Sequence, residues 1–244
     1  QRMHLSAVFG ATALLGVPAL VATFYLSMVT DQGLLWGILL FYGLSPIVGS
    51  WLAVGAGRRV FGDDLALGQV LKEYARRAIR LTLHLWWYRI LTLAAHLGVV
   101  TGVLVAVRAA SLPEAVLLEQ LRGARLRHRL GELTRGVQSS PVMSFVTIWT
   151  YTLLSVVSLF LLAHFVSDNI LGTPIWYHPG EGASAALDRL TYDPVAVTSL
   201  MACLWALYPV ARLAWFFVYL DQRIRNECWD VELDFRREAK RLSS

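Results

Sequence analysis

"LSAVFGATALLGVPALVATFYLSMV" occupies residues 5–29, and "LLWGILLFYGLSPIVGSWLAVGA" follows almost at once at residues 34–56. Each stretch is long enough to cross a bilayer core of about 30 Å at about 1.5 Å of rise per helical residue. The connection "TDQG" between them is short, so the two stretches predict a tight hairpin of membrane-spanning helices.

The composition of the whole chain agrees with a membrane environment. Of its 244 residues, 56% are hydrophobic and only 16% are charged, which exceeds what a soluble domain of this length usually carries. Two further spans are predicted at residues 142–166 and 194–220. The net charge of +5 does not require nucleic acid, because membrane proteins concentrate Lys and Arg on one face.

The central stretch from Leu83 to Leu121 is nearly continuously apolar, too long for one span and short for two. A single crossing would place the basic segments 58–80 and 122–135 on opposite sides, against the positive-inside bias. A turn near "HLGVVTG" (96–102) instead puts both basic segments and both termini in the cytoplasm. We therefore expect an all-α polytopic membrane protein, a single domain over 1–244, with about six membrane segments at 5–29, 34–56, 83–98, 101–120, 142–166 and 194–220, the third and fourth forming a short hairpin.

Charged helices are expected on the cytoplasmic side, at 63–80, 122–135 and 221–241, and an irregular outside loop at 167–193. In 63–80, apolar residues recur at three- and four-residue spacing opposite a basic face, which is typical of a helix in the headgroup layer. Setting the topology is the favoured role of this helix. The alternative is a contact with anionic lipid headgroups through Arg76, Arg77 and Arg80.

Four charged residues stand in or near apolar segments: Arg89, Arg108, Glu114 and Arg212. An unpaired charge there costs about 2.5 kcal/mol or more, so each is expected to pair or to reach water. Position alone suggests that Arg212 either extends to the interface or meets Glu114. We favour structural pairing over a substrate or proton path, because Pro18, Pro46 and Pro209 supply only mild kinks.

The terminal segment "YLDQRIRNECWDVELDFRRE" (219–238) balances acids against bases. Asp221 with Arg225, and Arg223 with Glu227, stand four residues apart, which supports a helix leaving the membrane. A basic tail would suffice to hold lipid, so the matched acids favour a surface that faces protein. The expected partner-docking residues are Asp221, Arg223, Arg225, Glu227, Asp230 and Glu232.

The pattern Tyr-x-Asp-x-Arg-x-Arg-x-Glu-x-x-Asp-x-Glu-Leu, read from Tyr219 to Leu233, resembles the C-terminal signature of the membrane domain of glycerophosphoryl diester phosphodiesterases and its stand-alone bacterial relatives. Residues 112–136, "LPEAVLLEQLRGARLRHRLGELTRG", resemble the family's Pro-Glu block followed by a basic helix. Here His128 and Arg129 stand where an Arg-Ser pair is common. The resemblance implies a multi-span protein of the bacterial inner membrane that belongs to a membrane assembly.

Catalytic and metal-binding patterns are weak. The phosphodiesterase activity of that family belongs to a separate barrel domain, and its His-Arg-Gly opening motif does not occur in this sequence. The six histidines are scattered without metal-ligand spacing, and no Gly-rich segment fits a phosphate loop. We expect no enzyme activity, cofactor, metal or nucleic-acid partner. Two functions remain: a non-catalytic subunit or scaffold that docks other proteins, and a protein that binds or moves a lipid or amphiphile.

Overall fold

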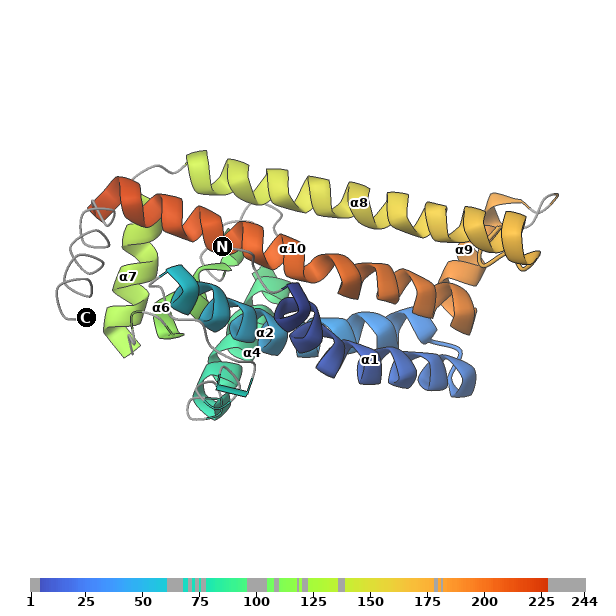
Figure 1. The fold of residues 1–244 in the computed structure, drawn as a ribbon, viewed down its shortest axis with the longest axis horizontal. Helices are drawn as coiled ribbons and strands as arrows, with labels where there is room; N and C mark the ends of the chain where they lie inside the picture. Colours follow the sequence, from blue (N-terminus) through green and yellow to red (C-terminus); the bar gives the residue numbers. More distant parts are fainter. Residues whose placement is uncertain are drawn as a thin grey trace. The chain divides into compact units, whose positions relative to one another are not determined.

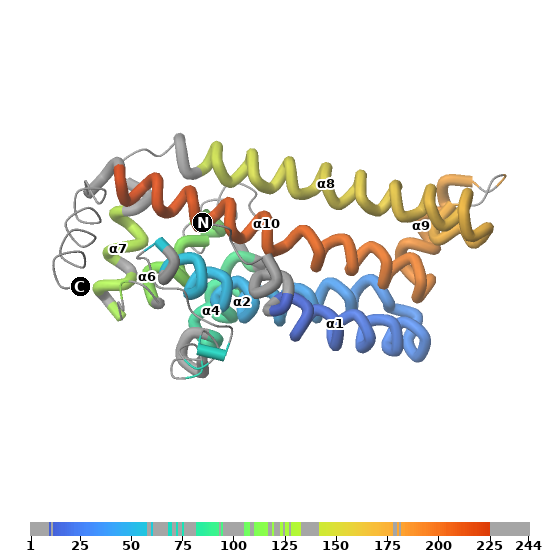
Figure 2. The backbone as a smooth tube through the Cα atoms, viewed as in Figure 1, coloured from blue at the N-terminus to red at the C-terminus, as the bar shows by residue number. Residues whose placement is uncertain are grey.

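The computed structural model describes residues 5–60, 68–69, 72, 75, 78–95, 105–107, 110–117, 119, 123–135, 139–177, 180 and 182–227. All regular secondary structure within these residues is α-helical. The helices are α1 (Leu5–Val29), α2 (Gly33–Val60), α4 (Ala78–Ala95), α6 (Leu112–Leu117), α7 (Gly123–Arg135), α8 (Ser139–Leu171), α9 (Ala183–Tyr192) and α10 (Pro194–Glu227) (Figures 1 and 2).

Four helices of the described chain are long and apolar enough to cross a membrane. Their apolar portions are Thr12–Val29 of α1, Gly33–Gly57 of α2, Val142–Leu171 of α8 and Pro194–Ile224 of α10. The expectation of an all-α protein with several membrane-spanning helices is therefore confirmed at the level of four candidate spans.

Contacts divide the chain into two compact units, and three of the long helices contribute to both. The first unit comprises residues 1–48 and 149–209. In it, close backbone approach at glycine joins the helices: an added Cβ at Gly16 would lie 3.3 Å from the Trp205 ring, and one at Gly37 would lie 2.9 Å from Met201 Cγ. Small residues let membrane helices approach closely, and Gly16 and Gly37 serve that purpose for α1, α2 and α10.

The segment 167–193 is more regular than its Gly and Pro content predicts. α8 continues to Leu171 and ends where Gly172 adopts φ +66°, with the Gly172 N–H donating to the Asp168 carbonyl. α9 then occupies Ala183–Tyr192. The expectation of an irregular loop is therefore wrong for residues 167–171 and 183–192, whereas the described residues between the two helices carry no regular secondary structure. Within α9, Ala186 is buried, and the Trp176 indole donates to its carbonyl at 2.7 Å.

The second unit comprises residues 49–148 and 210–244. Its short helix α6 is anchored by Leu112 and Ala115, both fully buried, and it contacts α4 and α7. α7 is amphipathic, and it turns Leu126 and Leu130 inward while Arg125 and His128 are exposed. These contacts hold a charged helix beside the C-terminal part of α10.

Several predicted boundaries differ from the observed ones. The third predicted segment, 83–98, corresponds to α4, whose 18 residues include Arg80 and Arg89 and do not reach the apolarity of the four spans. In the fourth, 101–120, the described residues form only short helical pieces, α6 among them. The predicted span 194–220 and the beginning of the predicted helix 221–241 form one helix, since α10 continues without interruption to Glu227. Most of the predicted helix 63–80 lies outside the described residues.

Candidate functional site

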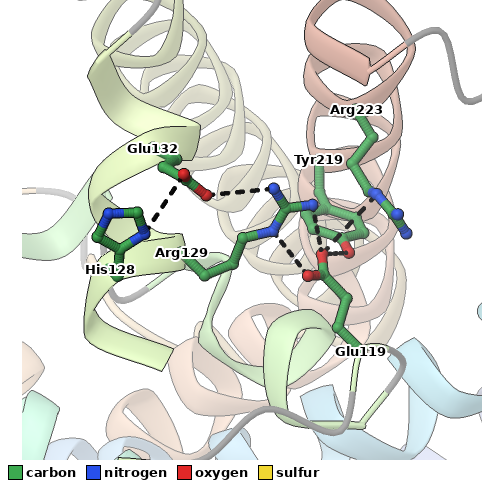
Figure 3. A network of polar contacts seen from close by, with 6 residues as sticks. All are labelled: Glu119, His128, Arg129, Glu132, Tyr219 and Arg223. Atoms are coloured by element: carbon green, nitrogen blue, oxygen red, sulfur yellow. Dashed lines mark hydrogen bonds and ion pairs between the residues drawn. The ribbon is translucent and has the colours of Figure 1, made fainter. Parts of the chain in front are cut away.

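Among the described residues of the second unit, a network of polar contacts is centred on the Glu119 carboxylate (Figure 3). Glu119 lies two residues beyond α6, and its backbone N–H approaches the Glu114 carbonyl at 3.4 Å. The carboxylate contacts Arg129 of α7 and both Tyr219 and Arg223 of α10. These residues, together with His128 and Glu132 of α7, are called the Glu119 cluster below.

The distances show which contacts dominate the Glu119 cluster. Arg129 donates in a bidentate arrangement, from Nε to Oε2 at 2.7 Å and from a terminal nitrogen to Oε1 at 3.3 Å. The Tyr219 hydroxyl donates to Oε1 at 2.6 Å, and Arg223 Nε lies 3.8 Å from the same oxygen. Such fork-shaped contacts to a carboxylate are stronger and more directional than a simple ion pair.

Burial separates an inner and an outer part of the Glu119 cluster. The side chains of Glu119, Arg129 and Arg223 are only 12%, 17% and 14% exposed. Glu132 and His128 are 48% and 71% exposed. Glu132 Oε2 lies 3.5 Å from a terminal nitrogen of Arg129, and His128 Nδ1 lies 3.3 Å from Glu132 Oε1. The inner contacts are therefore largely shielded from water and fix geometry, whereas the outer pair contributes little stability.

A second polar contact lies on the same two segments of chain. Arg212 of α10 donates to Glu114 of α6, and both side chains are buried, with Glu114 fully so. Burial raises the pKa of the Glu114 carboxyl, and the neighbouring Arg212 guanidinium opposes that rise. The other oxygen, Oε2, has no hydrogen-bond partner within the described part of the chain. The meeting of Arg212 with Glu114 is one of the two arrangements that the sequence suggests.

The remaining predicted charges are placed less completely. Arg89 is partly buried on α4, and Arg108 lies outside the described residues. Of the expected docking residues, Asp221 is exposed, whereas Arg223 turns inward to Glu119. The backbones of Arg80, Arg225 and Glu227 are helical, but their side chains are outside the description, and so are Arg76, Arg77, Asp230 and Glu232 entirely.

Sequence reasoning did not assign site roles to Glu119, Arg129 or Tyr219. The two blocks that resemble the phosphodiesterase membrane domain contain all three, and the structure brings these blocks into contact through Glu119 with Tyr219. Glu114 of the first block also meets Arg212, which lies seven residues before the second block. The available signal was the presence of Glu114 and Glu119 in the first block and of Tyr219 and Arg223 in the second. The sequence did not show which of these residues contact each other, because about 100 residues separate the two sides of each contact.

Among the residues that the structure describes, no group of three His, Cys, Asp or Glu side chains is placed to hold a metal ion. Comparison with known proteins finds no matching family model, no matching curated protein and no matching solved structure.

Proposed function

We propose that this chain is a non-catalytic integral membrane subunit or scaffold of a bacterial membrane assembly. In this proposal it resides in the inner membrane with both termini in the cytoplasm, where charged helices dock other proteins. Its relation to the membrane domain of glycerophosphoryl diester phosphodiesterases is part of the same proposal. The alternative function is binding or transport of a lipid or amphiphile.

The observation that carries this proposal is the Glu119 cluster. Its two carboxylates and two guanidinium groups contact each other and join the segment that follows α6 to α7 and α10. Desolvated charge pairs of this kind set the relative position of the elements that they join. A rigid junction at the end of the last span supports a platform role for the charged helix α7 and the end of α10.

The orientation of α10 refines which residues of the terminal signature serve a partner. Arg223 and Tyr219 face Glu119, so we assign them to the junction itself. Asp221 is exposed on the same helix, two residues from each. We therefore assign docking to Asp221 and to the residues that follow Arg223, namely Arg225, Glu227, Asp230 and Glu232.

The test is purification of the tagged full chain from its native membrane, with mass spectrometry of the proteins and lipids that accompany it. A docking variant carries Asp221→Ala, Arg225→Ala and Glu227→Ala, and it leaves Tyr219 and Arg223 in place. The matched control is a triple substitution of charged side chains elsewhere that removes the same net charge, Asp168→Ala, Asp188→Ala and Arg189→Ala; Asp188 is exposed and the other two are partly exposed.

A protein present in stoichiometric amount with wild type and control, but lost from the docking variant at unchanged thermal stability, is the expected result. A chain without any protein partner that carries one enriched lipid would overturn the scaffold proposal. That result would favour the lipid-binding alternative.

A further inference from the structure

Helix α4 presents a stripe of large apolar side chains to its surroundings. The stripe consists of Leu83, Trp86, Trp87, Ile90 and Leu91, which are between 43% and 64% exposed. Their spacing of three and four residues places them on one side of the helix over more than two turns. Soluble surfaces rarely carry a continuous apolar stripe of this size, so this one indicates a contact with an apolar partner.

The other sides of α4 have a different character. Leu85 and Thr92 are buried on the opposite side, and the Thr92 hydroxyl donates to the Tyr88 carbonyl of the same helix. α4 also contacts α6. At 100° per residue, His84 borders one edge of the stripe and Arg89 the other. α4 therefore has a protein-facing side, an apolar side rich in Trp and polar edges between them.

This arrangement differs from that of a spanning helix. Arg89 lies near the middle of Ala78–Ala95, so a crossing α4 would bring a guanidinium close to the bilayer centre at a cost of about 2.5–3.5 kcal/mol. Apolar residues with Trp on one face and basic residues beside them are typical of helices that lie in the membrane interface. Trp prefers the headgroup level, where its ring is apolar and its N–H remains wet.

We propose that α4 lies in the plane of the membrane surface, with the stripe formed by Leu83, Trp86, Trp87, Ile90 and Leu91 inserted where the acyl chains of a glycerophospholipid bilayer meet its headgroups. The chain's four candidate spans already bring it into contact with that bilayer. Arg89 and His84 then stand at headgroup level, where the charge of Arg89 complements lipid phosphate.

An in-plane α4 also agrees with the positive-inside distribution of the basic residues. The segments 58–80 and 122–135 share one side of the membrane if the chain between them crosses an even number of times. Zero crossings satisfy this condition, and so does a hairpin with two crossings. The proposal does not depend on the scaffold function, since it concerns only how α4 meets lipid.

The test measures the depth of spin labels in the full chain, reconstituted into phosphatidylcholine vesicles with one-third phosphatidylglycerol. Single cysteines replace Leu83, Trp87, Ile90 and Ala94 in a Cys203→Ala and Cys228→Ser background. Depth follows from the relative accessibility of each label to oxygen and to a polar nickel complex. An in-plane α4 gives four similar, shallow depths.

The control is a set of labels with the same spacing on the span α8, at Leu154, Ser158, Leu161 and Phe165. Eleven residues of a spanning helix rise by roughly 16 Å, so the control depths change steadily along the set. The same steady change on α4 would overturn the proposal in favour of a crossing helix. Labels on α4 that oxygen cannot reach would overturn it in favour of a protein partner. If only two of the labelled chains reconstitute, their two depths still give the change of depth along the helix.

Discussion

At the scale of single residues, the Glu114–Arg212 pair shows what a buried charge requires. Glu114 is fully buried, and of its two oxygens only Oε1 accepts a bond from a described side chain. The attraction between the two ions therefore has to offset the desolvation of both. A pair of this kind contributes little net stability, but the loss of one member leaves an uncompensated charge in the interior.

Glu114→Leu alone is expected to lower the free energy of unfolding by about 3–5 kcal/mol, because it leaves the Arg212 guanidinium buried without its carboxylate. The double variant Glu114→Leu with Arg212→Met removes both charges and should recover most of that loss. The measurement is thermal unfolding of the purified chain in detergent. Equal losses in the single and double variants would contradict this account.

The Glu119 cluster makes a different use of charge, because its strength lies in geometry. Arg129→Lys keeps the positive charge but removes the bidentate contact with Glu119, since an ammonium group has no planar fork. We expect a loss of about 1.5–3 kcal/mol, the usual contribution of a hydrogen bond to a charged group.

The matched control for this substitution lies on the same helix. Arg125 is exposed on α7, so Arg125→Lys should change the unfolding temperature in detergent little. A similar loss in both variants would show that the change in helix propensity or in lipid contact, not the Glu119 contact, accounts for the effect.

These residues also mark what sequence alone can predict. Glu114 and Arg212 stood out because charges in apolar segments are costly wherever they occur. Arg129 did not stand out, because it is one of several arginines in a basic stretch. Only the folded arrangement turns it toward Glu119, between the buried Leu126 and Leu130 of the same helix.

At the scale of elements, long apolar helices were predictable and their polar ends were not. α1 occupies the predicted residues 5–29, whereas α8 extends beyond the predicted 142–166 at both ends. Hydropathy falls at Ser139 and again at Ser167, but backbone hydrogen bonding continues until Gly172 provides a left-handed stop. α9 was missed because its ten residues carry a weaker pattern than the Gly and Pro residues around it.

Substitutions at two glycines of α2 test whether glycine is needed there for close helix packing or only for its backbone flexibility. An added Cβ at Gly37 would lie 2.9 Å from Met201 Cγ and 3.3 Å from Thr23 Cγ2, whereas one at Gly43 meets nothing within 4 Å. Gly37→Val should therefore destabilise the chain by about 1–3 kcal/mol more than Gly43→Val, through overpacking. Thermal unfolding in detergent measures the difference, and equal effects would assign it to backbone propensity instead.

At the scale of the whole molecule, the number of crossings between α2 and α8 decides which loops share a side. With an even number there, the loop after α1 and the segment after α8 lie on the same side of the membrane. With one crossing they lie on opposite sides. This comparison separates the arrangements without any assumption about how α4 itself meets the bilayer.

Single cysteines at Asp31 and Asp188, in the Cys203→Ala and Cys228→Ser background, provide the measurement. Asp31 follows α1, and Asp188 is exposed on α9. In sealed vesicles of one orientation, a membrane-impermeant maleimide should label both positions or neither, and it should label an Arg125→Cys chain in the opposite manner. Opposite labelling of Asp31→Cys and Asp188→Cys would require an odd number of crossings between α2 and α8. It would then place the basic segments 58–80 and 122–135 on different sides, and the predicted topology would be wrong.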